Sequence, residues 1–249
     1  MSLNTPATPT DRTRPTVVLV HGAFAESSSW NDVIASLSRD GYPVIAAANP
    51  LRGLHADAEY LRTVLDSVPG PIVVAGHSYG GSVMSEAADG HPQVKALVYV
   101  ASFILEAGES TGELAAKFPG GELGPALNSV PLPTGDGQDV TDLYIQQDRF
   151  REVFAADVPQ DIAALMAVTQ RPIVADALEE KATRSAWKTI PSWNLVTLQD
   201  LAVPAESQRF MGERAGSHTV EVEASHAVAV SQPEVVARLI IEAARATSR

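Results

Sequence analysis

The sequence predicts an α/β protein built on a doubly wound, mainly parallel sheet of about six strands. Segments without polar alternation, which is the pattern of strands covered on both faces, recur along the chain. Segments with apolar residues at helical spacing separate most of these strands. One interval near the middle breaks the alternation, and we expect a mainly helical cap there because long structureless insertions are uncommon in compact domains.

In chain order, the expected strands lie at residues 16–20, 43–47, 72–75, 96–101, 193–197 and 218–224. The expected helices lie at residues 31–39, 56–68, from 82 onward, 204–215 and 233–246. Gly41 ends the first of these helices, and Pro69 with Gly70 ends the second. Strands that alternate with helices of this length form a parallel sheet.

Between about residues 105 and 190 the sequence contains no convincing buried strand. The Pro/Gly-rich stretch FPGGELGPALNSVPLPTGDGQD predicts a loop, and helical patterns follow at residues 143–154 and 159–168. We therefore expect residues 105–190 to form a cap insertion over the carboxyl edge of the sheet. Residues 16–104 and 191–249 would form the core, and residues 1–15 a flexible N-terminal tail.

The composition is that of an ordinary soluble protein, with 249 residues, 45% hydrophobic and 19% charged. A formal net charge of -12 without a Lys/Arg cluster argues against nucleic acid or an anionic membrane as partner. No apolar run approaches membrane-spanning length, and the polar N-terminus is unlike a signal peptide, so a cytoplasmic location is expected. The absence of cysteine excludes a cysteine nucleophile and thiolate metal sites.

The stretch PIVVAGHSYGGSVMSEAA predicts a sharp turn from a buried strand into a helix. Gly76 and Gly80 allow the backbone to pass close to itself in that turn, which leaves Ser78 at its apex. This arrangement is a nucleophile elbow, in which the serine hydroxyl points out of the carboxyl edge of the sheet. A serine hydroxyl is a poor nucleophile alone, so a base, an acid and an anion site must lie elsewhere.

Two residues at the ends of other expected strands fit the acid and the base. The strand in WNLVTLQD ends at Asp200, and the strand in TVEVEASH ends at His226. The order Ser, Asp, His along the chain is the order that this architecture uses. Glu106 is the main competitor for the acid, although it lies several residues beyond its strand.

The oxyanion of an acyl-transfer reaction needs backbone N–H donors. One is expected from Tyr79, directly after the nucleophile, and the other from Ala23 in the loop after the first strand, with Phe24 as the alternative. His21 and His77 lie beside these elements, where packing and hydrogen bonding are the favoured roles. We expect loop or surface positions for the remaining histidines, His55, His91 and His218. No His/Asp/Glu grouping has metal-ligand spacing, so neither a metal nor another cofactor is expected.

The motifs HGAF, GHSYGG, LQDLAVP and ASHAVAVSQPEVVA together resemble the α/β-hydrolase superfamily from about residue 16 to the C-terminus. The phrases HGA, ALVYVASF and FAADVPQDIAALMAVTQRPI are similar to the esterase branch that includes plant methyl esterases and hydroxynitrile lyases. The lyases of that branch typically have Thr after the first-strand His and Lys after the catalytic His. Gly22 and Ala227 occupy these positions here, so the resemblance favours hydrolysis.

These observations predict a serine esterase that hydrolyses a small carboxylic ester through an acyl-enzyme. A cofactor-free haloperoxidase or perhydrolase would use the same triad, and the sequence does not separate the two reactions. A hydroxynitrile lyase and a non-catalytic small-molecule receptor are less favoured. Four apolar residues are candidates to line the substrate pocket, namely Phe24, Trp30, Phe103 and Trp187.

Overall fold

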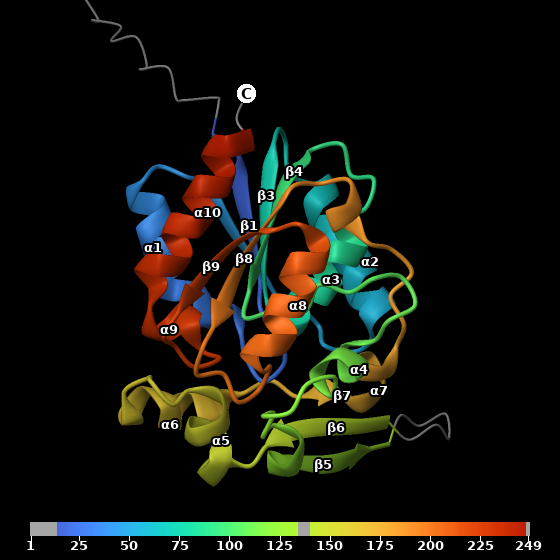
Figure 1. Cartoon of the computed structure of the whole chain (residues 1–249), viewed down its shortest axis with the longest axis vertical. Helices are drawn as coiled ribbons and strands as arrows, with labels where there is room; N and C mark the ends of the chain where they lie inside the picture. The colour runs from blue at the N-terminus through green and yellow to red at the C-terminus, as the bar shows by residue number, and fades with distance from the viewer. Residues whose placement is uncertain (1–13, 134–139, 248–249) are drawn as a thin grey trace, which may run out of the picture.

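A six-stranded parallel sheet lies at the centre of the molecule in a computed structural model that describes residues 14–133 and 140–247 (Figure 1). The strands follow the order β2-β1-β3-β4-β8-β9, and every neighbouring pair is parallel. Their bounds are β1 (Thr16–Val20), β2 (Val44–Ala47), β3 (Ile72–His77), β4 (Val94–Val100), β8 (Ser192–Thr197) and β9 (His218–Val222). This architecture confirms the predicted fold class. The expected tail at residues 1–15 falls almost entirely outside the described residues.

Helices cover both faces of this sheet (Figure 1). On one face lie α1 (Asn31–Arg39) and α10 (Pro233–Thr247), and on the other lie α2 (Leu54–Asp66), α3 (Tyr79–Ala88) and α8 (Ala205–Ala215). Alternate residues of β1 enter two separate apolar cores, because Val17 and Leu19 pack under α1 and α10 while Val18 and Val20 pack on the opposite face. Burial on both faces explains why these strands lack polar alternation.

The two edges of the sheet are less buried than the sequence suggested. All but the last residue of β9 are exposed, and β2 at the other edge is half-buried. The segment predicted as a buried strand at residues 218–224 is therefore a short edge strand. Three of its four exposed positions carry polar or charged side chains, namely His218, Thr219 and Glu221, which suits an edge without a further partner strand among the described residues.

The chain between β4 and β8 forms a group of short elements beyond the carboxyl ends of the strands (Figure 1). Its helices are α4 (Thr111–Ala115), α5 (Gln147–Phe154), α6 (Gln160–Thr169) and α7 (Ala175–Glu179). Its strands are β5 (Leu127–Leu132), β6 (Val140–Ile145) and β7 (Ile173–Val174), which form an antiparallel sheet. We call this group the cap.

The antiparallel sheet of the cap was not predicted from the sequence. The helical pattern expected at residues 143–154 is wrong at its start, because residues 143–145 belong to β6. The buried residues of β6 are Asp142 and Ile145, three positions apart, which is a spacing that imitates a helix. Within the described residues, no helix is long and apolar enough to cross a membrane.

Candidate active site

Ser78 lies between β3 and α3 in a conformation that is unusual for a residue with a side chain. Its φ and ψ are 53° and -127°, and three donors surround its carbonyl oxygen. These donors are the backbone N–H of Gly81 at 3.0 Å, the hydroxyl of Ser102 at 2.7 Å and the N–H of Phe103 at 3.4 Å. Strained backbone persists only where its surroundings hold it, and these bonds hold the turn that carries Ser78.

Glycines make the tight packing around this turn possible. A Cβ added to Gly76 would lie 2.7 Å from the backbone of Gly80, and one added to Gly80 would lie 2.4 Å from Val20 O. A Cβ at Gly22, in the loop after β1, would lie 2.7 Å from the Cβ of Ser78. Only glycine at position 22 therefore allows the loop after β1 to lie this close to Ser78.

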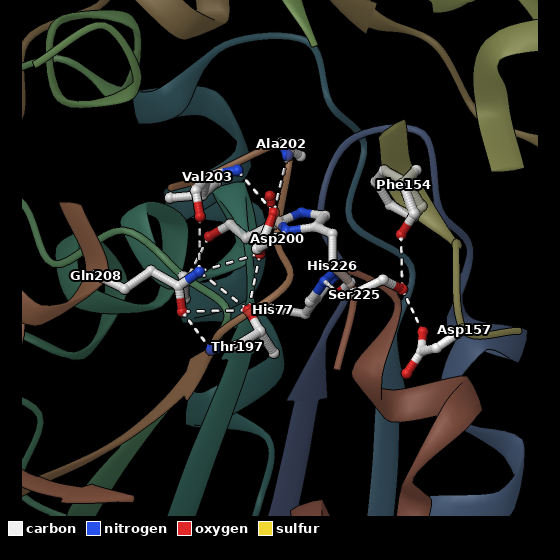
Figure 2. Close-up of polar contacts among 12 residues, drawn as sticks. His77, Phe154, Asp157, Thr197, Asp200, Ala202, Val203, Gln208, Ser225 and His226 are labelled. Carbon is white, nitrogen blue, oxygen red and sulfur yellow. Dashed lines mark hydrogen bonds and ion pairs between the residues drawn. The ribbon is translucent and has the colours of Figure 1, made fainter. Parts of the chain in front are cut away.

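Asp200 follows β8 and is fully enclosed by hydrogen-bond donors (Figure 2). Its Oδ1 accepts the backbone N–H groups of Ala202 and Val203, each at 2.8 Å. Its Oδ2 accepts the hydroxyl of Thr197 at 2.8 Å and the side-chain amide of Gln208 at 3.0 Å. Oδ1 of Asp200 thus stabilises the turn after β8, and the hydrogen bonds to Oδ2 fix the orientation of the buried carboxylate.

His226 lies directly against that carboxylate. Its Nδ1 is 2.7 Å from Oδ2 of Asp200, and because a carboxylate only accepts, Nδ1 carries the proton. In the neutral ring, Nε2 is then the unprotonated nitrogen, as a general base requires. Among the described residues no hydrogen bond joins Nε2 to Ser78, and catalytic hydrogen bonds are often long before substrate binds.

His77 connects His226 to the nucleophile elbow. It immediately precedes Ser78, its ring is 4.6 Å from the ring of His226, and its Nε2 donates to the carbonyl of His226 at 2.9 Å. Burial, followed by the neighbouring His226, lowers the pKa of His77 well below its usual value of 6.5. His77 is therefore a neutral structural donor, the role that the sequence favoured.

The cap also holds the loop of His226 (Figure 2). Phe154, the last residue of α5, packs its ring edge-on against His226 with centroids 4.8 Å apart. Its carbonyl accepts the N–H of Ala227 at 2.9 Å, and Ser225 donates its hydroxyl to Asp157. Residues on both sides of His226 are thus bonded to the cap.

In the loop after β1, the N–H of Ala23 has no hydrogen-bond partner among the described residues. The N–H of Tyr79, the first residue of α3, is similarly without a recorded partner. The N–H of Phe24 is used, because it donates to the carbonyl of Arg171 at 3.0 Å. Between the two alternatives from the sequence, this geometry favours Ala23 over Phe24 as the second oxyanion donor.

His21 fixes the same loop from the core side. Its Nδ1 lies 2.9 Å from the carbonyl of Gly22, and its Nε2 accepts the N–H of Asn49 at 3.0 Å. The side chain of Asn49 donates in return to His21 O at 3.0 Å. Burial lowers the pKa of His21, which agrees with a neutral ring that donates through Nδ1 and accepts through Nε2.

The other predicted acid lies apart from this arrangement. Glu106 forms an ion pair with Lys188 on the surface and makes no recorded contact with His226 among the described residues. His55 and His218 are exposed as expected. His91 lies in the turn after α3, but it is buried, and its Nε2 is 3.2 Å from Oδ1 of Asp66.

The four candidate pocket residues have different surroundings. Phe24 lines a hollow beside the site, and Phe103 is buried next to the elbow, where its N–H bonds Ser78. Trp30 is completely buried in the core under α1 and α10 and does not line this hollow. The indole N–H of Trp187 donates to Leu105 O, and the guanidinium of Arg214 lies over its ring. Arg214 is in the last turn of α8, at the end of that helix farther from Asp200.

The hollow beside Phe24 has a volume of about 120 Å³. Phe24 contributes one wall, Val230 of α9 (Val228–Ser231) another, and Ile162 and Met166 of α6 a third. Along the chain, Phe24 directly follows Ala23, and α9 begins two residues after His226. A cavity of about this size accommodates a ring such as benzene.

Sequence reasoning missed the residues that hold the site in place. They are Asn49, Ser102, Phe154, Arg171, Thr197 and Gln208. A signal existed for Thr197, a polar residue that ends a buried strand three positions before the predicted acid. Among the described residues, no group of three or more His, Cys, Asp or Glu side chains is arranged to hold a metal ion.

Comparison with known proteins gave a family and several relatives. A family model described as the alpha/beta hydrolase family matches residues 17–239. A pyrethroid hydrolase of Sphingobium wenxiniae is 27% identical over 92% of this chain and 88% of its own length. The putative chloroplastic methylesterase 11 of Arabidopsis thaliana is 25% identical over 92% of this chain and 63% of its own length. The crystal structure of polyneuridine aldehyde esterase superposes with a TM-score of 0.81 at 19% identity, over 92% of this chain and 98% of that one.

Proposed function

The chain belongs to the alpha/beta hydrolase family and has esterase relatives, and from this premise we propose that it is a serine esterase of small carboxylic esters. The observation that carries the proposal is the contact between His226 Nδ1 and the enclosed carboxylate of Asp200. It orients an unprotonated Nε2 beside the strained turn that holds Ser78.

In the proposed reaction, Ser78 Oγ attacks the ester carbonyl carbon while His226 Nε2 takes the hydroxyl proton. The carbonyl oxygen becomes an oxyanion that accepts the N–H groups of Ala23 and Tyr79. The protonated imidazole then donates its proton to the alcohol oxygen as the carbon–oxygen bond breaks, which leaves an acyl-enzyme. Water then attacks the acyl carbon while His226 takes one of its protons. The bond between that carbon and Ser78 Oγ breaks, Oγ receives the proton from His226, and the carboxylic acid is released.

The hollow beside Phe24 supports a substrate with a compact apolar group. Its apolar walls come from the loop after β1, from α6 and from α9, and polar side chains such as Ser29 and Gln170 line the rest. Phe24 of this lining directly follows the proposed oxyanion donor in the chain. We place there either the acyl or the alcohol portion of the ester, up to about the size of one aromatic ring.

Hydroxynitrile lyase chemistry is disfavoured by position 22. The lyases of the branch that this chain resembles have threonine there. In this chain, a Cβ at Gly22 would lie 2.7 Å from Ser78 Cβ and 2.8 Å from His77 O. Ala227 also carries no charge that would hold a departing cyanide. The perhydrolase alternative uses the same residues, so only an assay distinguishes it.

The test compares three reactions on the wild-type protein and on Ser78→Ala. We expect Ser78-dependent hydrolysis of short p-nitrophenyl esters, with benzoate or phenylacetate esters accepted as well. Mandelonitrile should not be cleaved faster than in buffer, and acetate-dependent bromination should be slower than hydrolysis. Ser78→Ala should retain less than a few per cent of turnover with an unchanged circular dichroism spectrum. Dominant bromination would favour the perhydrolase, and Ser78-dependent cyanide release without ester turnover would favour the lyase.

A further inference from the structure

We propose that Arg171 of the cap is a positioning residue for oxyanion stabilisation, because it holds the loop after β1 so that the Ala23 N–H faces Ser78. This inference rests on the proposed esterase reaction. Arg171 touches neither Ser78 nor His226 in any recorded contact among the described residues, and it acts through Phe24 and Glu26.

The loop needs an external support because its backbone is strained. Phe24 has a φ of 60°, in the left-handed region that a bulky residue rarely adopts. The residue before it supplies the proposed donor, so any relaxation of Phe24 toward ordinary φ values would turn the Ala23 N–H. Strain of this kind persists only where neighbouring contacts determine the conformation.

Arg171 makes two contacts that act on this strained segment. Its carbonyl accepts the N–H of Phe24 at 3.0 Å, which occupies the donor next to Ala23. Its guanidinium pairs with both carboxylate oxygens of Glu26, with Nε at 3.0 Å and the second nitrogen at 3.3 Å. A forked pair of this geometry fixes direction as well as distance. One cap residue thus holds the loop through the backbone at Phe24 and through the side chain at Glu26.

The segment that contains Arg171 is itself well anchored. Gln170, directly before it, exchanges hydrogen bonds with both the N–H and the carbonyl of Ile145 in β6, at 2.8 and 2.9 Å. The carbonyl of Pro172, directly after it, accepts a hydrogen bond from the guanidinium of Arg52 at 2.9 Å. Arg171 is therefore presented by a fixed part of the cap rather than by a free loop.

Exposure separates a positioning role from a role in stability. The side chains of Arg171 and Glu26 are each 37% exposed, so their ion pair adds little to the stability of the fold. An oxyanion donor, by contrast, is worth about 10² to 10³ in kcat when it is removed. A loop that is only loosened should lose part of that factor.

The experiment measures kcat, KM and the melting temperature of Arg171→Ala against wild type on a short p-nitrophenyl ester. Arg171→Ala keeps the backbone bond to Phe24 and loses the ion pair with Glu26. We expect kcat to fall roughly tenfold with KM within about twofold, because the loosened loop carries a donor that acts in the transition state. The melting temperature should change by less than about 2 °C. The matched control is Arg149→Ala, which removes another cap ion pair, Arg149 with Glu152, for which the described part of the chain shows no contact with the loop.

A phenylboronic acid provides the decisive measurement, because its adduct with Ser78 places an oxygen where the oxyanion forms. Its inhibition constant should weaken by the same factor as kcat/KM in Arg171→Ala, whereas that of a non-covalent product analogue, the free acid, should not change. The reversed pair, Glu26→Arg with Arg171→Glu, should recover part of the lost kcat.

Three outcomes would overturn the inference: an unchanged kcat in Arg171→Ala, an equal loss in Arg149→Ala, or equal weakening of both inhibitors. Failure of the esterase proposal looks different, since wild type would then show no Ser78-dependent ester turnover. That result would remove the premise and overturn this inference with it.

Discussion

The two halves of the candidate site are held by different parts of the chain. The carboxylate of Asp200 takes its supporting donors from residues 197–208, a short segment of the core. The loop with Ala23 depends on His21 and Asn49 in the core but also on Arg171 in the cap. We refer to these halves as the acid side and the oxyanion side.

The difference between them is one of redundancy. On the acid side, four donors in addition to His226 bind one carboxylate, so the loss of one leaves others in place. On the oxyanion side, a strained loop that carries the unpaired N–H of Ala23 is held by a few long-range contacts within the described residues. We therefore expect supporting substitutions on the acid side to reduce mainly stability, and those on the oxyanion side to reduce mainly rate.

The largest effect tests the acid itself. Asp200→Asn keeps the shape but presents an amide to His226, which favours the wrong imidazole tautomer, and the analogous loss in a serine protease is ~10⁴-fold in kcat. Ester turnover and thermal melting would be measured together. Glu106→Gln is the control, because Glu106 pairs only with Lys188 on the surface, and it should stay within about twofold of wild type. A more damaging Glu106→Gln would place the acid elsewhere.

The next effect tests the oxyanion side at its closest approach. Gly22→Thr forces the loop away from Ser78, since even the Cβ would lie 2.7 Å from the Cβ of that serine. We expect kcat to fall by about 10² to 10³, as for the loss of an oxyanion donor. Gly124→Thr is the matched control, because a Cβ there meets nothing within 4 Å. Near wild-type turnover in Gly22→Thr would mean that the loop does not supply a donor.

A smaller effect sharpens the contrast in redundancy. Gln208→Leu removes one donor from Asp200 and leaves the buried N–H of Thr197 without its acceptor. An unsatisfied buried group costs about 1–3 kcal/mol, so the melting temperature should drop by several degrees, while kcat falls by only about tenfold or less. Thermal unfolding and turnover of the same preparation check this. A large loss of kcat with unchanged melting would contradict the proposed redundancy.

The smallest effect concerns two neutral histidines, His77 beside His226 and His21 at the loop after β1. Burial depresses the folded-state pKa of both His77 and His21, so the unfolded chain binds more protons once the pH drops below about 6.5. Stability is then fully present above that pH and decreases on acidification, by at most about 1.4 kcal/mol per pH unit for each histidine. Urea unfolding between pH 8 and 5 measures the slope. His77→Gln can donate without titrating, so it should flatten the slope, and identical slopes would count against this account.

The sequence was sufficient to predict the elements that follow from local pattern. Two-sided burial produced the apolar runs of β1 and β3, and glycine spacing indicated the turn at Ser78. Asp200 and His226 could be found because parallel strands end at one edge of a sheet, so polar residues at those ends meet. In each case, burial, a tight turn or a strand end restricts which residue types can occupy a position that the sequence identifies.

Other features carry no such restriction on residue type. The acceptor for Phe24 is a backbone carbonyl of Arg171, which any residue type would supply. The core position of Trp30 could not be predicted, because an aromatic side chain after the first strand suits a core under α1 as well as a pocket. His91 is buried against Asp66 only because of how the turn after α3 packs on α2. These contacts depend on tertiary packing and not on local pattern.

The distances along the chain between partners on the two sides also set the order in which a folding chain can assemble them. Thr197 and Gln208 are 11 residues apart, whereas Glu26 and Arg171 are 145 residues apart. Closing the longer loop from the unfolded chain costs about 2 kcal/mol more in entropy than closing the shorter one. Local contacts around the acid can therefore form early, but the last support of the oxyanion loop must await the cap. Refolding should restore native helix content before esterase activity, and a chain interrupted before residue 171 would lack that support during synthesis.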